Sequence, residues 1–418
     1  MSKVVYFGYS ASGHINPTLG VVRELVAKGE SVYYYSIPDY KSLIETTGAQ
    51  FRDDLSIDFI DKHIVNSNVA KLDPVDEFIG FVITNITMGR NIINSILDEV
   101  KEINPDYIIH DSFCSWGKEL AQILNVPAIS TITIFALNNE MIETDPVGLV
   151  SNLIRINLAA DEDLDAGRIY KRLWSRVSKM SGRLIDQTDF DLIDTFINKE
   201  ELNIVFTSRE FQIYPDTFDE SFSFIGPSLE FRSNSKGFPY EKLTDKPVIY
   251  ISLGTIYNKN TEFYRKCFEA FGNADKQVVL SIGNETCIDS LGNIPNNFLV
   301  RNHVPQIEIL KHAGVFITHG GMNSVNEGIY NNVPLIVFPQ NADQFLVASQ
   351  VEKLGVGVYI KNQDIAAAEL RKLTIDMYMN KDFITKCNKI SNSFMKSGGC
   401  QKALEDIIKF KAKMGINK

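Results

Sequence analysis

The chain has 418 residues, of which 44% are apolar and 22% charged, and its formal net charge at pH 7 is −10. A chain of this length exceeds what one hydrophobic core usually supports, so we predict two domains. The acidic balance argues against nucleic acid and against an anionic membrane as partners, because both select a basic protein face.

The first predicted element is a buried strand over residues 3–8, an apolar run that no basic segment or cleavage site of a signal peptide precedes. The stretch YSASGHINPT, residues 9–18, follows it. A strand, a glycine-bearing turn and a helix are how dinucleotide-binding folds begin, but the G-x-G-x-x-G fingerprint is missing here. His14 stands where that fingerprint would hold a pyrophosphate.

A helix is predicted next, because Pro17 suits a first helical turn with Asn16 as its N-cap. It should continue to about Lys28, since Gly29 follows as a stop signal. In the rest of the first half, strand-like runs alternate with helical patterns, as they do in parallel α/β sheets. Strands are predicted near 31–36, 106–110, 127–132 and 203–206, with helical patterns over 75–101 and within 141–198.

The second half repeats this opening at residues 246–257, KPVIYISLGTIY, where a buried strand and a glycine turn precede a helix over 261–271. We therefore predict an α/β protein of two Rossmann-like domains. Further strands are predicted near 277–282, 298–301, 314–318, 334–338 and 356–359. The predicted limits are 1–225 for the first domain, 226–246 for an exposed linker, 247–398 for the second domain and 399–418 for a terminal helix.

The five cysteines are scattered and include no C-x-x-C pair, so neither a disulfide framework nor a zinc site is predicted. A reducing compartment suits such a pattern. No uncharged apolar run approaches the ~18 residues that would span a bilayer. The sequence therefore predicts a cytoplasmic protein without a membrane segment.

The segment THGGMNS, residues 318–324, has the features of a phosphate-binding turn between a strand and a helix. Two glycines let a ligand approach the backbone closely, and the N–H groups of a helix start favour an anion. His319, Asn323 and Ser324 can add hydrogen bonds to phosphate oxygens. For the H-G-G triplet alone, the alternative is a tight turn with a satisfied surface histidine.

Further polar residues extend this candidate site. Glu327 lies one helical turn after Asn323, and its carboxylate suits the two hydroxyls of a ribose. Asp343 and Gln344 follow the next strand, at the carboxyl end of the sheet where ligands bind in open α/β folds. Together these residues favour a nucleotide site over a simple turn.

The run from HVPQIEIL (303–310) through THGGMNSVNEG (318–328) to PQNADQ (339–344) resembles the nucleotide-sugar signature of the family-1 UDP-glycosyltransferases. GHINP, residues 13–17, is similar to the G-H-x-x-P motif of the bacterial macrolide glycosyltransferase subfamily. The resemblance covers nearly the whole chain. It implies the GT-B fold, in which two Rossmann-like domains face a central cleft. The first domain would bind the acceptor, the second the UDP-sugar, and the last helix would cross back to the first domain.

The resemblance also implies a role for each residue of the signature. His303 takes the place of a tryptophan that stacks on uracil in plant relatives, and its smaller area should loosen base selectivity. Val304 and Gln306 would meet the uracil edge, and Glu327 would bind the ribose. The diphosphate would be held by Ser252, Thr255, His319, Gly321, Asn323 and Ser324, and the sugar hydroxyls by Asp343 and Gln344.

His14 and Asp111 are the candidate catalytic residues. A neutral imidazole can take the proton of an acceptor hydroxyl near pH 7, and a carboxylate would orient it and stabilise the imidazolium that forms. Asp111 ends another predicted strand of the first domain, and it matches the family's catalytic aspartate. The alternative is that His14 merely caps the helix beginning at Pro17.

Other signals in the sequence are weaker. Aromatic and methionine residues of the first half would line an apolar acceptor pocket, although at helical spacing they are also ordinary core. The triplet DED at 161–163 matches the D-x-D of metal-dependent glycosyltransferases, but its acidic helical surroundings favour a solvated helix face. His63 and His312 receive no role, and His110, which precedes Asp111, receives none but leaves the question open. The acceptor candidates are Phe78, Phe81, Met88, Phe113, Phe135 and Met141.

These inferences describe an inverting, UDP-sugar-dependent glycosyltransferase. It would move a hexose, glucose before N-acetylglucosamine, to a hydroxyl of a small lipophilic acceptor such as a macrolide, a flavonoid or another phenol or alcohol. No metal or other cofactor is expected, because a helix dipole and His319 would neutralise the diphosphate. The chain is expected to be a monomer or a weak dimer. Two alternatives remain, a nucleotide-sugar epimerase or hydrolase of the same fold and a non-catalytic auxiliary protein.

Overall fold

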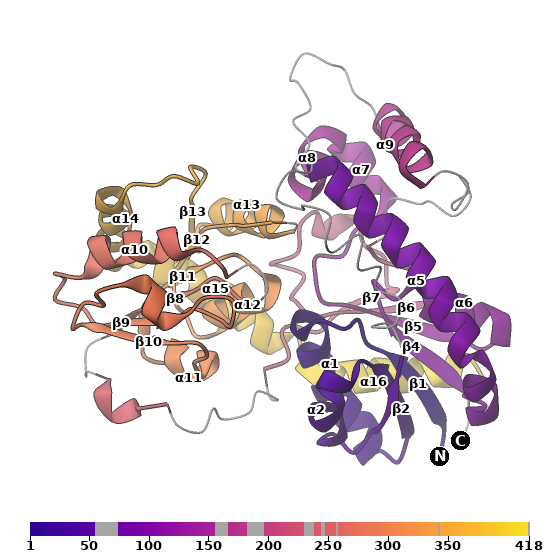
Figure 1. Cartoon of the computed structure of the whole chain (residues 1–418). Helices are drawn as coiled ribbons and strands as arrows, with labels where there is room; N and C mark the ends of the chain where they lie inside the picture. The colour runs from indigo at the N-terminus through magenta and orange to yellow at the C-terminus, as the bar shows by residue number, and fades with distance from the viewer. Residues whose placement is uncertain are drawn as a thin grey trace. The chain divides into compact units, whose positions relative to one another are not determined.

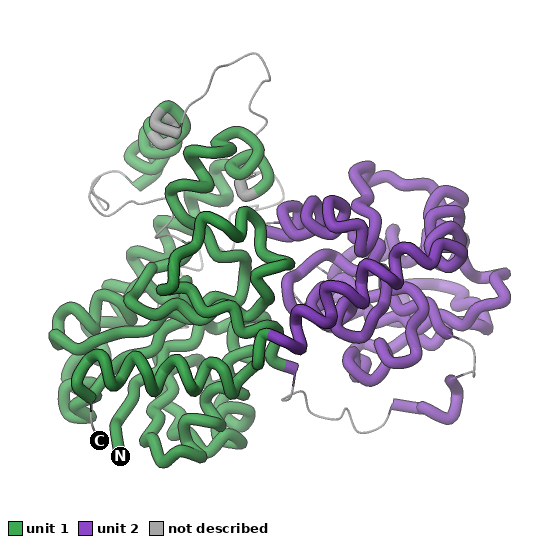
Figure 2. Tube along the Cα trace, turned by 180° about the vertical axis from the view of Figure 1, so that it is seen from behind, with its two compact units in different colours: residues 1–228, 397–418 green, residues 229–396 purple. Residues whose placement is uncertain are grey.

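The computed structural model describes residues 1–54, 74–154, 166–181, 196–229, 238–243, 247–255, 258–341 and 343–416 (Figure 1). The chain divides into two compact units (Figure 2). Unit 1 comprises Met1–Ser228 together with Ser397–Lys418, and unit 2 comprises Leu229–Lys396.

Unit 1 is built on a seven-stranded parallel sheet with the order β3-β2-β1-β4-β5-β6-β7. β4 and β5 are buried along their whole length, which is typical of strands covered on both faces. Parallel pairing of β1 with β4 and of β4 with β5 brings the carboxyl ends of these strands to one edge of the sheet. The strands are β1 (Lys3–Phe7), β2 (Ser31–Ser36), β3 (Gln50–Asp53), β4 (Tyr107–Asp111), β5 (Ala128–Ile132), β6 (Leu202–Val205) and β7 (Phe222–Phe224).

Helices pack around this sheet. α16, from the C-terminal part of the chain, packs on α1 and β6 (Figure 1). On it, the mostly buried Lys411 forms an ion pair with Glu30. The described helices of unit 1 are α1 (Ser12–Ala27), α2 (Lys41–Glu45), α5 (Pro74–Ile103), α6 (Ser115–Leu124), α7 (Asn139–Thr144), α8 (Pro146–Ile154), α9 (Ala166–Ser181) and α16 (Gly399–Lys413), with short 3-10 helices at Pro38–Tyr40 and Pro215–Thr217.

The start of α1 differs from the prediction. The helix begins at Ser12 with Ala11 at the N-cap, so Asn16 is not the cap and Pro17 lies inside the helix. A proline at the sixth helical position gives up one backbone hydrogen bond, and the preference of proline for a first turn does not exclude this. As a consequence, His14 is itself helical and lies in the first turn of α1, so it does not cap a helix that begins at Pro17.

Unit 2 is built on a six-stranded parallel sheet with the order β10-β9-β8-β11-β12-β13. The strands are β8 (Val248–Ser252), β9 (Val278–Ser281), β10 (Phe298–Arg301), β11 (Ala313–Thr318), β12 (Leu335–Val337) and β13 (Gly357–Tyr359). The described helices are α10 (Thr261–Phe271), α11 (Gln306–Leu310), α12 (Met322–Tyr330), α13 (Gln344–Leu354), α14 (Ala367–Met379) and α15 (Lys381–Lys396), with 3-10 helices at Tyr240–Lys242 and Ile288–Leu291.

The prediction of two Rossmann-like halves with parallel sheets is confirmed. Two strands were not predicted, β3 and β7, because they are short and lack an apolar run; the β3 sequence is QFRD. Among the helices that the structure describes, none is both long and apolar enough to cross a bilayer.

Candidate functional site

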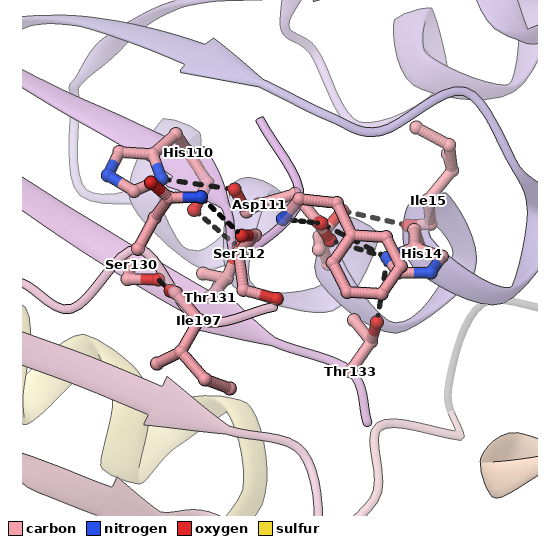
Figure 3. A network of polar contacts seen from close by, with 12 residues as sticks. His14, Ile15, His110, Asp111, Ser112, Ser130, Thr131, Thr133 and Ile197 are labelled. Atoms are coloured by element: carbon pink, nitrogen blue, oxygen red, sulfur yellow. Dashed lines mark hydrogen bonds and ion pairs between the residues drawn. The ribbon is translucent and has the colours of Figure 1, made fainter. Parts of the chain in front are cut away.

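His14 and Asp111 lie together at the carboxyl edge of the unit 1 sheet. His14 Nδ1 is 2.9 Å from Asp111 Oδ2 and 3.1 Å from Oδ1 (Figure 3). The Asp111 carboxylate is fully buried, and 12% of the His14 side chain is exposed. The backbone N–H of Phe113 donates to Asp111 Oδ1 at 2.9 Å, which holds the carboxylate in place.

The contacts of Nδ1 determine the tautomer of His14. A carboxylate can only accept, so Nδ1 carries a hydrogen and donates it to Asp111. Thr133, just beyond the end of β5, places its Oγ1 3.0 Å from the same nitrogen. In the neutral ring, Nε2 then carries the lone pair, and it points away from both partners (Figure 3). This is the tautomer that a proton acceptor requires.

Aromatic rings lie against His14. The ring centroid of Phe113 is 4.8 Å from that of His14, and the centroid of Tyr9 is 5.1 Å from it. Phe81 of α5 meets Phe113 edge-on with centroids 5.7 Å apart, and Phe196 lies 6.1 Å from Phe113. Two of the predicted acceptor residues, Phe81 and Phe113, thus belong to one aromatic cluster beside the histidine.

The other four predicted acceptor residues are more deeply buried. Phe78 is 9% exposed and stacks on Phe196 at 5.6 Å, so it extends the same aromatic cluster. Met88 packs in the hydrophobic core between α5, α6 and the sheet. Phe135 and Met141 are 2% and 0% exposed. These last three side chains are core residues in the structure, the alternative that their helical spacing left open.

In unit 2, the imidazole ring of His319 packs closely against two glycines. A Cβ atom on Gly254 would come within 2.6 Å of the ring, and one on Gly321 within 2.5 Å of Nε2. Gly254 also has a φ of +81°, a conformation that favours glycine. These glycines therefore make room for His319 itself as well as for any ligand.

His319 is neutral at pH 7. Burial lowers the pKa of its ring to about 4, while a hydrogen bond to the backbone of Ser252 acts in the opposite direction. A neutral ring can donate a hydrogen bond to a phosphate but brings no positive charge. With the ring neutral, the start of α12 is the positive feature of the turn, and a contribution of His319 to neutralising a diphosphate stays a prediction.

The start of α12 follows the glycine turn directly and presents the backbone N–H groups of a helix terminus. Asn323 and Ser324 lie partly buried in its first turn. Ser252 Oγ accepts from the N–H of Gly254 at 3.3 Å and so shapes the turn after β8, where Thr255 is exposed. Because β8 pairs with β11, the predicted diphosphate residues come from two adjacent strand ends.

The carboxylate of Glu327 is buried and held by a glutamine. Gln306 donates from Nε2 to Glu327 Oε2 at 2.7 Å and to Ser324 Oγ at 3.2 Å. The hydroxyl of Tyr250 donates to Gln306 Oε1 at 3.0 Å. The Gln306 amide therefore connects β8 to α12 and orients Glu327, a contact that the sequence does not predict.

Of the three residues predicted to meet the base, His303 and Val304 lie in the loop between β10 and α11, and Gln306 is the first residue of α11. His303 is exposed, and its Nε2 lies 2.7 Å from Asn284 Oδ1. This contact orients a ring that remains open to solvent, as a stacking surface must be. Val304 follows it and is partly buried.

Gln344 and Asp343 lie at the start of α13. Gln344 is 7% exposed, and its Oε1 accepts from the backbone N–H groups of Gln340 at 2.8 Å and Asn341 at 3.1 Å. The side-chain oxygen thus holds the loop after β12, and the –NH₂ group is the end that can donate to a sugar hydroxyl. Asp343 is the N-cap residue of α13 and is partly buried.

Some sequence signals fall outside this site. The triplet at 161–163 and His63 lie outside the described residues. Within the described part of the chain, no group of three or more His, Cys, Asp or Glu side chains could hold a metal ion. His312 is exposed on unit 2.

Three neighbours of the catalytic candidates were not identified from the sequence. Tyr9 and Thr133 follow β1 and β5 closely, so the rule that ligands bind at the carboxyl ends of parallel strands could have found both. Phe196 lies just after none of the strands that the structure describes, and it carries no comparable signal. Only the chain's path in three dimensions brings it next to Phe113.

Comparison with known proteins gives a consistent result. The family model described as "UDP-glucoronosyl and UDP-glucosyl transferase" matches residues 61–393. The uncharacterized UDP-glucosyltransferase YojK of Bacillus subtilis is 35% identical over 410 residues, which cover 98% of this chain and 97% of that protein. The oleandomycin glycosyltransferase of Streptomyces antibioticus is 27% identical, with 97% of this chain and 90% of that protein covered.

A solved structure has the same fold. The calicheamicin glycosyltransferase CalG4 matches with a TM-score of 0.75 at 23% identity, and the match covers 99% of this chain and 98% of that one. The predicted GT-B class is therefore confirmed.

Proposed function

Since the chain belongs to the UDP-glucoronosyl and UDP-glucosyl transferase family and is a UDP-glycosyltransferase, we propose that it is an inverting enzyme with His14 as its general base. The sugar would be a hexose, glucose before N-acetylglucosamine. The acceptor would be a hydroxyl of a small lipophilic molecule. One relative, the oleandomycin glycosyltransferase of Streptomyces antibioticus, is named for such a molecule, which supports this acceptor class.

The observation that carries the proposal is the hydrogen bond from His14 Nδ1 to the buried Asp111 carboxylate. In the reaction, the acceptor oxygen forms a bond to the anomeric carbon while the bond from that carbon to the diphosphate oxygen breaks. UDP leaves with the electron pair, and the acceptor proton passes to His14 Nε2. Asp111 stabilises the resulting imidazolium. Attack opposite to the leaving group inverts the configuration at the anomeric carbon.

The aromatic cluster beside His14 supports an apolar acceptor. Phe81 and Phe113 are partly buried, so part of each ring remains accessible. An apolar body resting on these rings would be held chiefly by removal of its surface from water. The hydroxyl to be glycosylated would then extend toward the imidazole.

The donor would be held without a metal ion. Backbone N–H groups at the start of α12, the neutral His319 and the Ser324 hydroxyl supply hydrogen bonds to the diphosphate, and the helix terminus supplies positive potential. We expect full activity in excess EDTA, measured as UDP release after removal of contaminating metal. Loss of activity that magnesium or manganese restores would contradict this prediction and would revive Asp161 and Asp163 as candidates.

Gln344 is proposed to select the sugar. Gln344→Ala should flatten the preference among UDP-sugars and leave the affinity for UDP unchanged, as measured by kcat/KM for several donors and by calorimetry with UDP.

Because Gln344 Oε1 also holds the loop at Gln340 and Asn341, Gln344→Glu is the matched control. It keeps acceptor oxygens for the loop, removes the –NH₂ donors and adds a negative charge. The same loss of sugar selectivity in both variants would support the proposal. Much weaker UDP binding in Gln344→Ala would instead assign the residue to the nucleotide.

Product analysis tests the reaction itself. Each UDP-sugar is incubated with and without a panel of phenols and macrolides, and the products are identified by mass spectrometry and their anomeric configuration by NMR. A β-linked glycoside from an α-linked donor, formed only with an acceptor, supports the proposal. Free sugar or an epimerised donor in the absence of an acceptor would favour the epimerase or hydrolase, and no product with any pair would favour the auxiliary protein.

A further inference from the structure

His110 is a buried histidine that the proposed reaction does not use. Its side chain is fully buried next to Asp111, near the end of β4. Nδ1 lies 3.0 Å from the backbone oxygen of Asp111, and Nε2 lies 3.3 Å from Glu200 Oε1. Both ring nitrogens therefore face oxygen atoms, one of the main chain and one of a side chain.

The positions of the protons follow from these partners. A carbonyl oxygen can only accept, so Nδ1 carries a hydrogen and donates it to Asp111. A second hydrogen must then lie between His110 Nε2 and Glu200, because an imidazole lone pair and a carboxylate would repel each other. His110 thus forms a continuous hydrogen-bonded link from the Glu200 side chain to the main chain of Asp111. Figure 3 shows the half of this link that joins His110 to Asp111.

Glu200 belongs to the 196–200 segment, which is attached at further points to the residue after β4 and to the middle of β5. Asn198 Nδ2 donates to the backbone oxygen of Ser112 at 2.9 Å, and Ser130 Oγ donates to the backbone oxygen of Ile197 at 3.0 Å. The first residue of the segment, Phe196, is part of the aromatic cluster beside His14. One short segment therefore contacts both the strand that carries Asp111 and the proposed acceptor side.

The packing around His110 leaves its ring little freedom. A Cβ on Gly117 of α6 would lie 2.4 Å from the Cβ of His110, so α6 approaches the histidine as closely as a glycine permits. The backbone of Glu200 is held in turn by Asn203, whose Oδ1 accepts from the Glu200 N–H at 2.9 Å and whose Nδ2 donates to the Glu200 oxygen at 2.8 Å. Both ends of the link are therefore fixed.

We propose that His110, linked to Glu200, is a positioning residue for the catalytic base. It fixes the main chain from which the Asp111 carboxylate reaches His14, and it ties that position to the segment that carries Phe196. The inference rests on the proposed function, because it assumes that His14 and Asp111 act as the base and its partner. A displacement of about 1 Å in such a pair can reduce the rate by roughly 10²-fold.

The test compares four variants with the wild type. His110→Leu removes both hydrogen bonds at similar volume, whereas His110→Asn keeps a donor near the position of Nδ1. Glu200→Ala removes the carboxylate, whereas Glu200→Gln can still donate an N–H to the ring. For each variant, kcat and KM are measured with an alcohol acceptor and with a thiophenol, and thermal unfolding is recorded.

We expect His110→Leu to lower kcat for the alcohol by roughly 10–100-fold with an unchanged donor KM. The thiophenol, which needs little help to lose its proton, should lose much less. His110→Asn should recover most of the alcohol rate. Glu200→Ala should show the same selective loss at smaller size, and Glu200→Gln should be close to the wild type. A general structural defect would lower kcat equally for the alcohol and for the thiophenol.

An unchanged ratio of alcohol to thiophenol rates in a folded His110→Leu would overturn the inference. If His110→Leu does not fold, the variants of the partly exposed Glu200 provide the test. Equal alcohol rates in Glu200→Ala and the wild type would then overturn the inference. His14→Ala is measured in parallel. If His14→Ala keeps its alcohol activity, the proposed function itself fails; if it loses that activity while the His110 and Glu200 variants do not, only the positioning role fails.

Discussion

Replacement of His14 by alanine should lower kcat for an alcohol acceptor by ~10²–10⁴-fold. An alcohol is a poor nucleophile until a base takes its proton, and His14 Nε2 is the nitrogen that the hydrogen bond from Nδ1 to Asp111 prepares for this. The affinity for UDP should not change, because His14 belongs to unit 1 and the proposed UDP site to unit 2. Steady-state kinetics and UDP calorimetry on the same preparation measure both quantities.

The loss should depend on the acidity of the acceptor. Acidic phenols and thiols are already partly ionised, so the His14→Ala enzyme should be least impaired with them. The rate loss should therefore increase with the pKa of the acceptor and be largest for the alcohols. His312→Ala, a change of an exposed histidine on unit 2, is the matched control and should leave the rates unchanged. A His14→Ala enzyme that kept most of its alcohol activity would contradict the mechanism.

Asp111 should act through His14. Asp111→Asn removes the charge that stabilises the imidazolium while keeping the size of the side chain, so its effect should be equal to or smaller than that of His14→Ala. The double variant should be little worse than His14→Ala alone, because two residues that act as a unit are not additive. Additive losses would indicate that Asp111 has a separate function.

Replacement of Glu327 by alanine should raise the donor KM by roughly 10- to 150-fold, the equivalent of about 1.5–3 kcal/mol for the loss of a charged hydrogen-bond acceptor. The acceptor KM should change little. Glu308→Ala is the matched control, since this carboxylate lies in the same unit and pairs with Lys311 at the surface. Equal effects of Glu327→Ala on both substrates would contradict a role in ribose binding.

A modified donor can separate this role from a structural one. Glu327 is fully buried and is held by Gln306, so its removal also changes the interior of unit 2. UDP-glucose analogues that lack the ribose 2′- or 3′-hydroxyl form a thermodynamic cycle with the variant. If Glu327 binds these hydroxyls, the analogues should bind more weakly than UDP-glucose to the wild type. To Glu327→Ala, the analogues and UDP-glucose should bind equally well. A parallel loss in both proteins would place the hydroxyls elsewhere.

The sequence alone determines the central strands of both sheets and where the ligand-binding edges lie, but it does not predict the edge strands β3 and β7. Continuous apolar runs such as residues 248–252 and 313–318 are typical of strands covered on both faces, and strands that alternate with helices pair in parallel. Parallel pairing brings the carboxyl ends of the strands to one edge, which is why His14 and Asp111 could be assigned to one site although 97 positions separate them. The turn and the helix start after β11 could also be predicted from the sequence, because glycines and helix termini have local backbone preferences.

Only the tertiary structure determines how these groups support one another. Thr133 contacts His14 although 119 positions separate them in the sequence, and Glu200 contacts His110 across 90 positions. No periodic pattern in a sequence indicates such contacts. The protonation of His319 also depends on the fold, because the pKa of an imidazole reflects the burial of the ring and not the residues next to it in the chain. Local sequence thus determines which elements form and where they end. The contacts that orient a base, hold a carboxylate or remove a charge arise only when distant side chains share one desolvated space.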